Sequence, residues 1–84
     1  MNLIKHIVNK KLNHMTTKEL LKYSKEYAVS ITTEQAEQIV PLLKGQNVNI
    51  YDTGERLELL KKIAKVTSPA TAQQINTLFQ QLLK

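Results

Sequence analysis

Apolar residues recur at a spacing of three and four along most of the chain, which is the pattern of a helix with one buried face. This pattern predicts five helices, over about residues 2–13, 17–27, 33–44, 53–66 and 69–83. Across residues 46–51 the helical spacing gives way to an alternation of apolar and polar residues, so that Val48 and Ile50 point one way and their polar neighbours the other. One short alternating segment has no partner strand, so we expect an extended connection whose Val48 and Ile50 pack under the helices. The predicted fold is all-α, a compact bundle of about five short helices in a single domain over residues 1–84.

Four helix starts carry recognisable capping residues. In three of them a threonine or aspartate precedes a glutamate or glutamine by three positions. The side chain of the first residue can then accept a hydrogen bond from the backbone N–H three residues later, and the side chain of the second can accept one from the backbone N–H of the first. The fourth start has a serine cap and a proline in the first helical position, where a missing N–H costs nothing. The pairs are Thr16 with Glu19, Thr32 with Gln35, Asp52 with Glu55, and Ser68 with Pro69.

Two residues bear on where the third helix ends. Pro41 lies inside the helical pattern and lacks the N–H that would bond to Glu37, so we expect a kink or an early stop near Val40. Gly45 supplies the left-handed conformation that commonly ends a helix.

The apolar spacing also predicts which side chains are buried. In the first helix these are Leu3, Ile4, Ile7, Val8 and Leu12, continued by Met15; in the second they are Leu20, Leu21, Ser24, Tyr27 and Ala28. The fourth helix has apolar residues around about half its circumference, which favours a central position in the bundle. The outward face of the last helix is uncharged and rich in amides, which suits either a contact surface or a merely neutral helix back.

Composition narrows the classes of function. The chain has no cysteine, which excludes disulfides, thiolate nucleophiles and cysteine-ligated metal sites and suits the cytoplasm. No segment approaches the roughly 18 unbroken apolar residues of a membrane-spanning helix, and the N-terminal segment lacks the features of a signal peptide. We therefore expect a soluble cytoplasmic protein that does not bind membranes.

The net charge of +5 is unevenly distributed. Residues 1–25 carry six lysines and one acid, residues 26–60 carry two basic residues and six acids, and residues 61–84 carry four lysines and no acid. Two basic ends that met on one face would attract an anionic partner, whereas lysines on the solvated backs of separate helices would have no such role. Both interpretations are compatible with the sequence.

Catalytic and metal-binding patterns are missing from the sequence. His6 and His14 are eight residues apart, too far to share an ion as neighbours on one helix, and no phosphate-binding or zinc-protease spacing occurs. Glu34 and Glu37 lie in a first helical turn, where acids are expected for the helix dipole. We expect a protein that is not an enzyme and has no metal, no cofactor and no small-molecule substrate.

Nucleic-acid binding is the main alternative to protein binding. The hairpin of the second and third helices resembles a helix-turn-helix, but its second helix begins with TTEQAEQIV, which would bring Glu34 and Glu37 to phosphates. A SAP-like hairpin, whose basic first helix meets the DNA backbone, suits this sequence better. The candidate phosphate contacts are Lys5, Lys10, Lys11, Lys18, Lys22 and Lys25, joined by Lys61, Lys62 and Lys65 if the two basic ends converge.

The whole pattern resembles a family of short bacterial proteins known as a domain of unknown function. The resemblance rests on TTKELLKYSKEYAVSITTEQAEQIVPLLKGQNVNIYD followed by SPATAQQIN, and it covers nearly the full chain. It implies a bacterial, cytoplasmic, helical protein and no activity. The leading hypothesis is a small interaction module that binds another protein or itself, and the alternative is weak, sequence-independent binding of nucleic acid.

Overall fold

The computed structural model describes residues 3–83, and the side chains of residues 7–83. It contains five helices, which are α1 (Leu3–Asn13), α2 (Thr17–Glu26), α3 (Thr33–Leu43), α4 (Thr53–Val66) and α5 (Pro69–Leu82). No strand occurs within residues 3–83, so the all-α prediction is confirmed. Residue 2, where we expected the first helix to begin, lies outside the described part. So do the side chains of Leu3, Ile4, Lys5 and His6.

The capping residues explain why the helices begin where they do. The side chains of Thr16, Thr32, Asp52 and Ser68 each accept a hydrogen bond from the backbone N–H three residues later. The full reciprocal arrangement is present at Thr32, whose backbone N–H donates to Gln35 Oε1 at 2.9 Å. At Thr16 the expected return bond is replaced, because its hydroxyl donates to Glu19 Oε1 at 3.0 Å.

Helix α3 continues through Pro41 to Leu43, so of the two outcomes expected near Val40, a kink or an early stop, the early stop is excluded. Ile39 and Leu43 are both fully buried on either side of the proline. Burying them keeps the last turn helical in spite of the missing hydrogen bond. Gly45 follows with φ of 75°, as predicted, and its N–H donates to the carbonyl oxygen of Asn13 at 2.9 Å.

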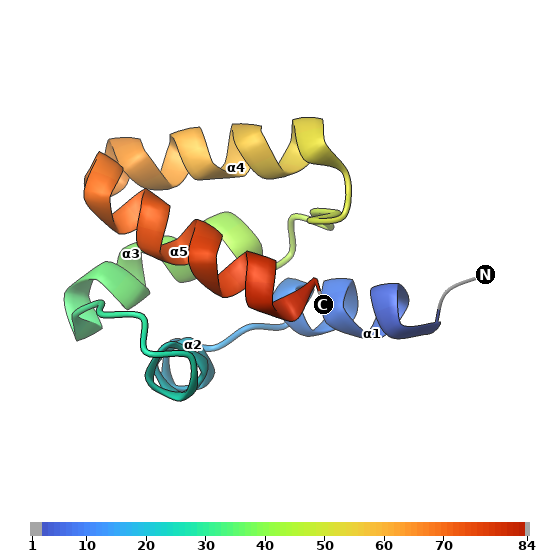
Figure 1. Cartoon of the computed structure of the whole chain (residues 1–84), viewed down its shortest axis with the longest axis horizontal. Helices are drawn as coiled ribbons and strands as arrows, with labels where there is room; N and C mark the ends of the chain where they lie inside the picture. Colours follow the sequence, from blue (N-terminus) through green and yellow to red (C-terminus); the bar gives the residue numbers. More distant parts are fainter. Residues whose placement is uncertain (1–2, 84) are drawn as a thin grey trace.

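Helix α5 is the centre of the molecule. It packs against α4 and α2, and it contributes five buried residues where α4 contributes two. Figure 1 shows α4 along one edge and α2 at the opposite edge, with α5 between them. The prediction that α4 is central is therefore wrong, and part of its broad apolar face is open to solvent, with Leu57 51% and Val66 42% exposed.

One buried cluster joins all five helices and the connection between α3 and α4. It contains Phe79, Leu78, Ile75 and Ala72 of α5, Leu59 and Ile63 of α4, Ala36, Ile39 and Leu43 of α3, Leu20 of α2, Leu12 of α1, and Met15, Val29 and Ile50 from connections. Three predicted core residues are instead exposed, namely Ile7, Tyr27 and Ala28. Ile7 lies on the side of α1 opposite Leu12, whereas Tyr27 and Ala28 follow the last turn of α2, where the chain leaves the helix.

The connection between α3 and α4 places Ile50 in the core, as predicted, whereas Val48 is only half-buried and lines a groove. Its backbone is not uniformly extended, because Asn47 has φ of 52° and a turn covers residues 50 and 51. These two bends let the segment follow the end of α1 before α4 begins.

Candidate functional site

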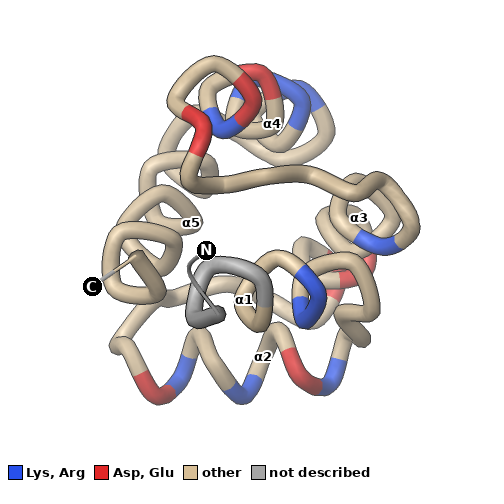
Figure 2. The backbone as a smooth tube through the Cα atoms, turned by 90° about the vertical axis from the view of Figure 1, so that its right-hand side faces the viewer, with Lys and Arg blue, Asp and Glu red and all other residues tan. Residues whose placement is uncertain are grey.

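The lysines of α2 form a basic stripe on the surface. Lys18, Lys22 and Lys25 are all exposed and fall on one face of the helix. Acidic residues are interleaved with them, since Glu19 follows Lys18 and Glu26 follows Lys25, and Figure 2 shows red and blue segments along the same helix. Each glutamate lies about 100° around the helix from the lysine that it follows, so an acidic flank runs beside the basic stripe.

The lysines of α4 lie far from this stripe. Lys61, Lys62 and Lys65 are exposed on α4, and Figures 1 and 2 both place α4 on the side of the molecule opposite α2. Lys61 forms an exposed ion pair with Glu58 at 3.7 Å. The structure does not bring the two basic segments together.

Helix α1 contributes two described lysines, Lys10 and Lys11, both exposed in its last turn. The Lys11 ammonium donates to the Tyr23 hydroxyl and lies 4.9 Å from the centre of its ring. The hydrogen bond to Tyr23 raises the pKa of Lys11 above its ordinary 10.5. Lys11 is thus engaged within the fold, and Lys5 lies outside the described side chains.

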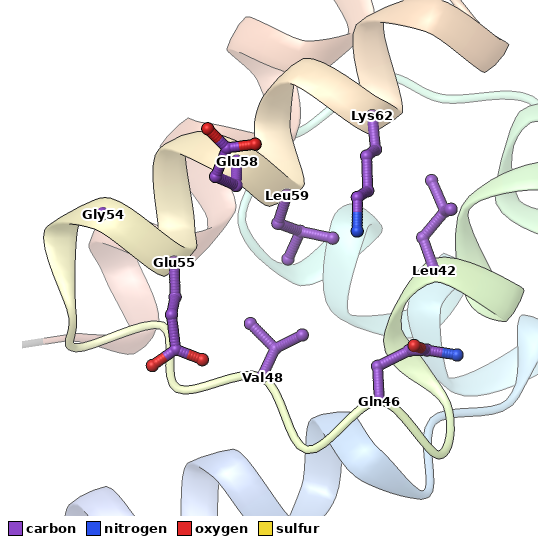
Figure 3. Close-up of a pocket in the computed structure, with 8 residues that line it drawn as sticks. All are labelled: Leu42, Gln46, Val48, Gly54, Glu55, Glu58, Leu59 and Lys62. Atoms are coloured by element: carbon purple, nitrogen blue, oxygen red, sulfur yellow. The ribbon is translucent and has the colours of Figure 1, made fainter.

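A groove of about 470 Å³ opens between the end of α3, the α3–α4 connection and α4. The half-buried Leu42 and Val48 supply most of its apolar surface, and the buried Leu59 lies beneath them. Figure 3 shows Val48 pointing toward Leu59 and the Lys62 side chain reaching from α4 between Leu59 and Leu42. The remaining lining residues are Gln46, Gly54, Glu55 and Glu58.

Charged side chains of both signs surround the apolar part of the groove. Glu55 Oε1 accepts from the backbone N–H of Asn49 at 3.4 Å, which ties the acidic end of α4 to the connection. Glu58 points to solvent beside Lys61, and Lys62 borders the other end. An apolar patch within a charged rim suits the side chain of another protein better than an enclosed small molecule.

A cluster of four asparagines, Asn9, Asn13, Asn47 and Asn49, lies beside this groove and lines a smaller hollow of about 220 Å³. Asn9 Nδ2 donates to Asn49 Oδ1 at 2.9 Å, and Asn9 Oδ1 accepts from the Ile50 N–H at 3.2 Å. Asn13 Oδ1 accepts from the Asn47 N–H at 2.9 Å. The asparagine cluster therefore fastens α1 to the α3–α4 connection and fixes one wall of the groove.

Sequence reasoning missed both the groove and the asparagine cluster. The hydrogen bonds of the cluster join residues 34 to 41 positions apart, and no local pattern marks such pairs. The sequence signal that could have indicated the cluster is the pair of asparagines in residues 9–13 together with the pair in residues 47–49.

Two further observations concern the described residues. No group of three or more His, Cys, Asp or Glu side chains there is arranged to hold a metal ion. None of the described helices combines the length and the apolar character needed to span a bilayer.

The fold and its surfaces define a small all-α protein with a shallow groove beside an interior filled by one apolar cluster. The chain belongs to the family described as "Protein of unknown function (DUF2624)", whose model matches residues 1–83. It is similar to the "Uncharacterized protein YqfT" of Bacillus subtilis (strain 168), with 47% identity over 81 residues that cover 96% of each chain. No solved structure matches the chain. The resemblance to a bacterial domain of unknown function is confirmed, and these descriptions assign no activity to the family.

Proposed function

We propose that the protein is a small non-enzymatic interaction module of the cytoplasm that binds a segment of a partner protein in the α3–α4 groove. The observation that carries this proposal is the half-exposed apolar pair Leu42 and Val48, with the buried Leu59 beneath them, within a rim of Glu55, Glu58 and Lys62. A partner side chain that covers the patch would gain the free energy of apolar burial, while the charged rim would select its flanking residues. The absence of cysteine supports the cytoplasmic location.

A peptide selection tests this proposal. Random peptides displayed on phage are selected on the protein, and the binding of the enriched peptides is then measured by fluorescence anisotropy. Val48→Ser removes apolar surface from the groove, and we expect it to weaken binding by about tenfold, which corresponds to about 1.4 kcal/mol. Gln74→Ser, on the exposed side of α5, is the matched control and should leave binding unchanged. A failure to enrich any peptide, or equal binding to both variants, would refute the proposal.

A second candidate function is sequence-independent binding of nucleic acid by the basic stripe of α2. It is favoured by one observation, that Lys18, Lys22 and Lys25 are exposed on a common face. Affinity for random duplex and single-stranded oligonucleotides should then fall steeply with salt, because lysine–phosphate contacts release counterions.

Two charge-reversal variants separate a specific basic face from a general effect of net charge. The double variant Lys18→Glu and Lys22→Glu should abolish oligonucleotide binding. The control, Lys61→Glu with Lys65→Glu, changes the net charge equally on the opposite side of the molecule and should retain it. No binding at low salt, or an equal loss in both variants, would eliminate this candidate.

A further inference from the structure

Lys62 differs from the other charged side chains that line the α3–α4 groove, because nothing in the described fold engages its charge. Glu55 accepts a hydrogen bond from the Asn49 N–H at 3.4 Å. Glu58 forms an ion pair with Lys61 at 3.7 Å. Within the described side chains, no hydrogen bond or ion pair reaches the Lys62 ammonium. The groove therefore contains a cation whose charge is available to a bound segment.

The position of this ammonium determines what it can meet. The Lys62 side chain extends between Leu59 and Leu42, beside the apolar part of the groove (Figure 3). The exposed Gln46, which follows α3, lies at the same end of the groove and has two amide N–H donors. An ammonium and an amide next to an apolar surface suit a carboxylate that has an apolar neighbour, because hydrogen bonds between ionised partners are the strong ones.

We infer that the segment bound in this groove carries an acidic side chain two residues from an apolar one, and that Lys62 binds its carboxylate. The inference rests on the proposed function, since it names the chemistry of the segment that the groove takes. The apolar side chain covers the half-buried Leu42 and Val48. In an extended segment, side chains two positions apart point to the same side and lie about 7 Å apart, so both can face the groove.

The other end of the groove limits how many acidic residues the segment carries. Glu55 and Glu58 line the groove toward the start of α4, and both are exposed. Their charge disfavours a second carboxylate on the far side of the apolar residue. At 1.5 Å per residue, Glu55 and Lys62 lie about 10 Å apart along the axis of α4, so a carboxylate at Lys62 is well separated from Glu55. The groove therefore favours a segment that is acidic on one side only.

Parallel peptide selections test the inference. Random peptides displayed on phage are selected on the unmodified protein and on Lys62→Glu, and the enriched sequences are compared. The unmodified protein should enrich peptides with Asp or Glu two positions from an apolar residue. Lys62→Glu should enrich Lys or Arg at that position, because the charge that the peptide meets is reversed. Lys22→Glu, at an exposed position of α2 on the opposite side of the molecule, changes the net charge equally and should still enrich the acidic peptides.

A synthetic peptide then measures the contact itself. One enriched sequence is compared with a counterpart in which the acidic residue is replaced by its amide, and the ends of both are blocked so that no terminal carboxylate takes part. By fluorescence anisotropy, the amide peptide should bind the unmodified protein about tenfold more weakly. Lys62→Met keeps the apolar stem of the side chain and loses the charge, so it should bind the two peptides equally.

The outcomes distinguish this inference from the proposed function. If the enriched peptides share no acidic residue, or if the unmodified protein and Lys62→Glu enrich the same sequences, the inference is overturned while the groove remains a binding site for apolar segments. A tenfold difference between the two peptides that persists on Lys62→Met would also overturn it, because another group would then bind the carboxylate. If no peptide is enriched on the unmodified protein, the proposed function fails and the inference fails with it.

Discussion

Ala28 adopts a backbone conformation that an L-amino acid with a Cβ atom disfavours. Its φ is 56°, and its side chain is exposed, so no packing compensates for the strain. Ala28→Gly should therefore raise the free energy of unfolding by about 1 kcal/mol, measured by urea denaturation. Ala70→Gly, at an exposed position in the first turn of α5, is the matched control and should lower it by less than the about 0.5–1 kcal/mol that glycine costs in the middle of a helix. A loss of stability in Ala28→Gly would contradict the left-handed conformation of this residue.

Lys11 and Tyr23 form a contact whose effect depends on pH. The hydrogen bond raises the Lys11 pKa in the folded protein, so its contribution to stability is full below the unfolded pKa of about 10.4 and is lost as pH rises through the folded value. Tyr23→Phe removes the acceptor oxygen, and we expect the Lys11 pKa, followed by NMR of its side chain, to fall. The difference in Tm between the two proteins should be constant from about pH 6 to 9 and should shrink above about pH 10.4.

Tyr27→Phe is the control for this titration because Tyr27 follows the same helix and is exposed. It should leave the Lys11 pKa unchanged. Equal effects of the two tyrosine variants would show that Lys11 does not bond specifically to Tyr23.

At the scale of the element, the helix starts were predictable because each depends on residues within four positions of one another. Thr32 and Gln35 are an example, since the sequence alone predicts both of their capping hydrogen bonds. The end of α3 was not predictable by the same means. Pro41 disfavours the last turn locally, and burial of Leu43 against other helices outweighs that preference.

The attachment of α1 depends on side chains that no local pattern singles out. Asn9 bonds to both Asn49 and the Ile50 N–H, so Asn9→Ala removes two hydrogen bonds and leaves a partly buried donor without its partner. We expect a loss of about 1–3 kcal/mol. Hydrogen exchange should show faster exchange in α1 while protection in α4 and α5 is retained.

Lys10→Ala, at the exposed neighbouring position, is the control and should leave the exchange of α1 unchanged. Uniformly faster exchange throughout the Asn9→Ala protein would mean that α1 and the rest of the core open together.

At the scale of the whole molecule, the core depends most on α5. Phe79 is fully buried at the centre of the shared cluster. Phe79→Ala should cost about 3–5 kcal/mol, a large part of the stability of a domain of this size. Because all five helices share the cluster, circular dichroism should show one transition at a lower temperature and no partially helical plateau. Gln80→Ala, next to it and exposed, should stay within about 0.5 kcal/mol of the unmodified protein.

The arrangement of the helices in space was the part that the sequence left undetermined. The breadth of the apolar face of α4 favoured a central position, yet α5 occupies it and Leu57 is exposed. The two basic segments likewise lie on opposite sides, and the groove exists because Val48 meets Leu42 and Leu59 from two helices. Helical periodicity fixes which way a side chain points on its own helix, but the neighbour that it meets depends on the packing of the whole chain.

The asparagine cluster has a consequence for synthesis on the ribosome. Asn9 is made 41 residues before the Ile50 N–H to which it bonds. At a rate of about 5–20 residues per second, the first helix waits about 2–8 seconds before its binding site has been polymerised. During that interval the side chains of Leu12 and Met15, buried in the finished protein, have no covering segment. Helix α1 therefore cannot dock through Asn9 until the connection after α3 has been made, and its apolar side chains stay without that contact during the interval.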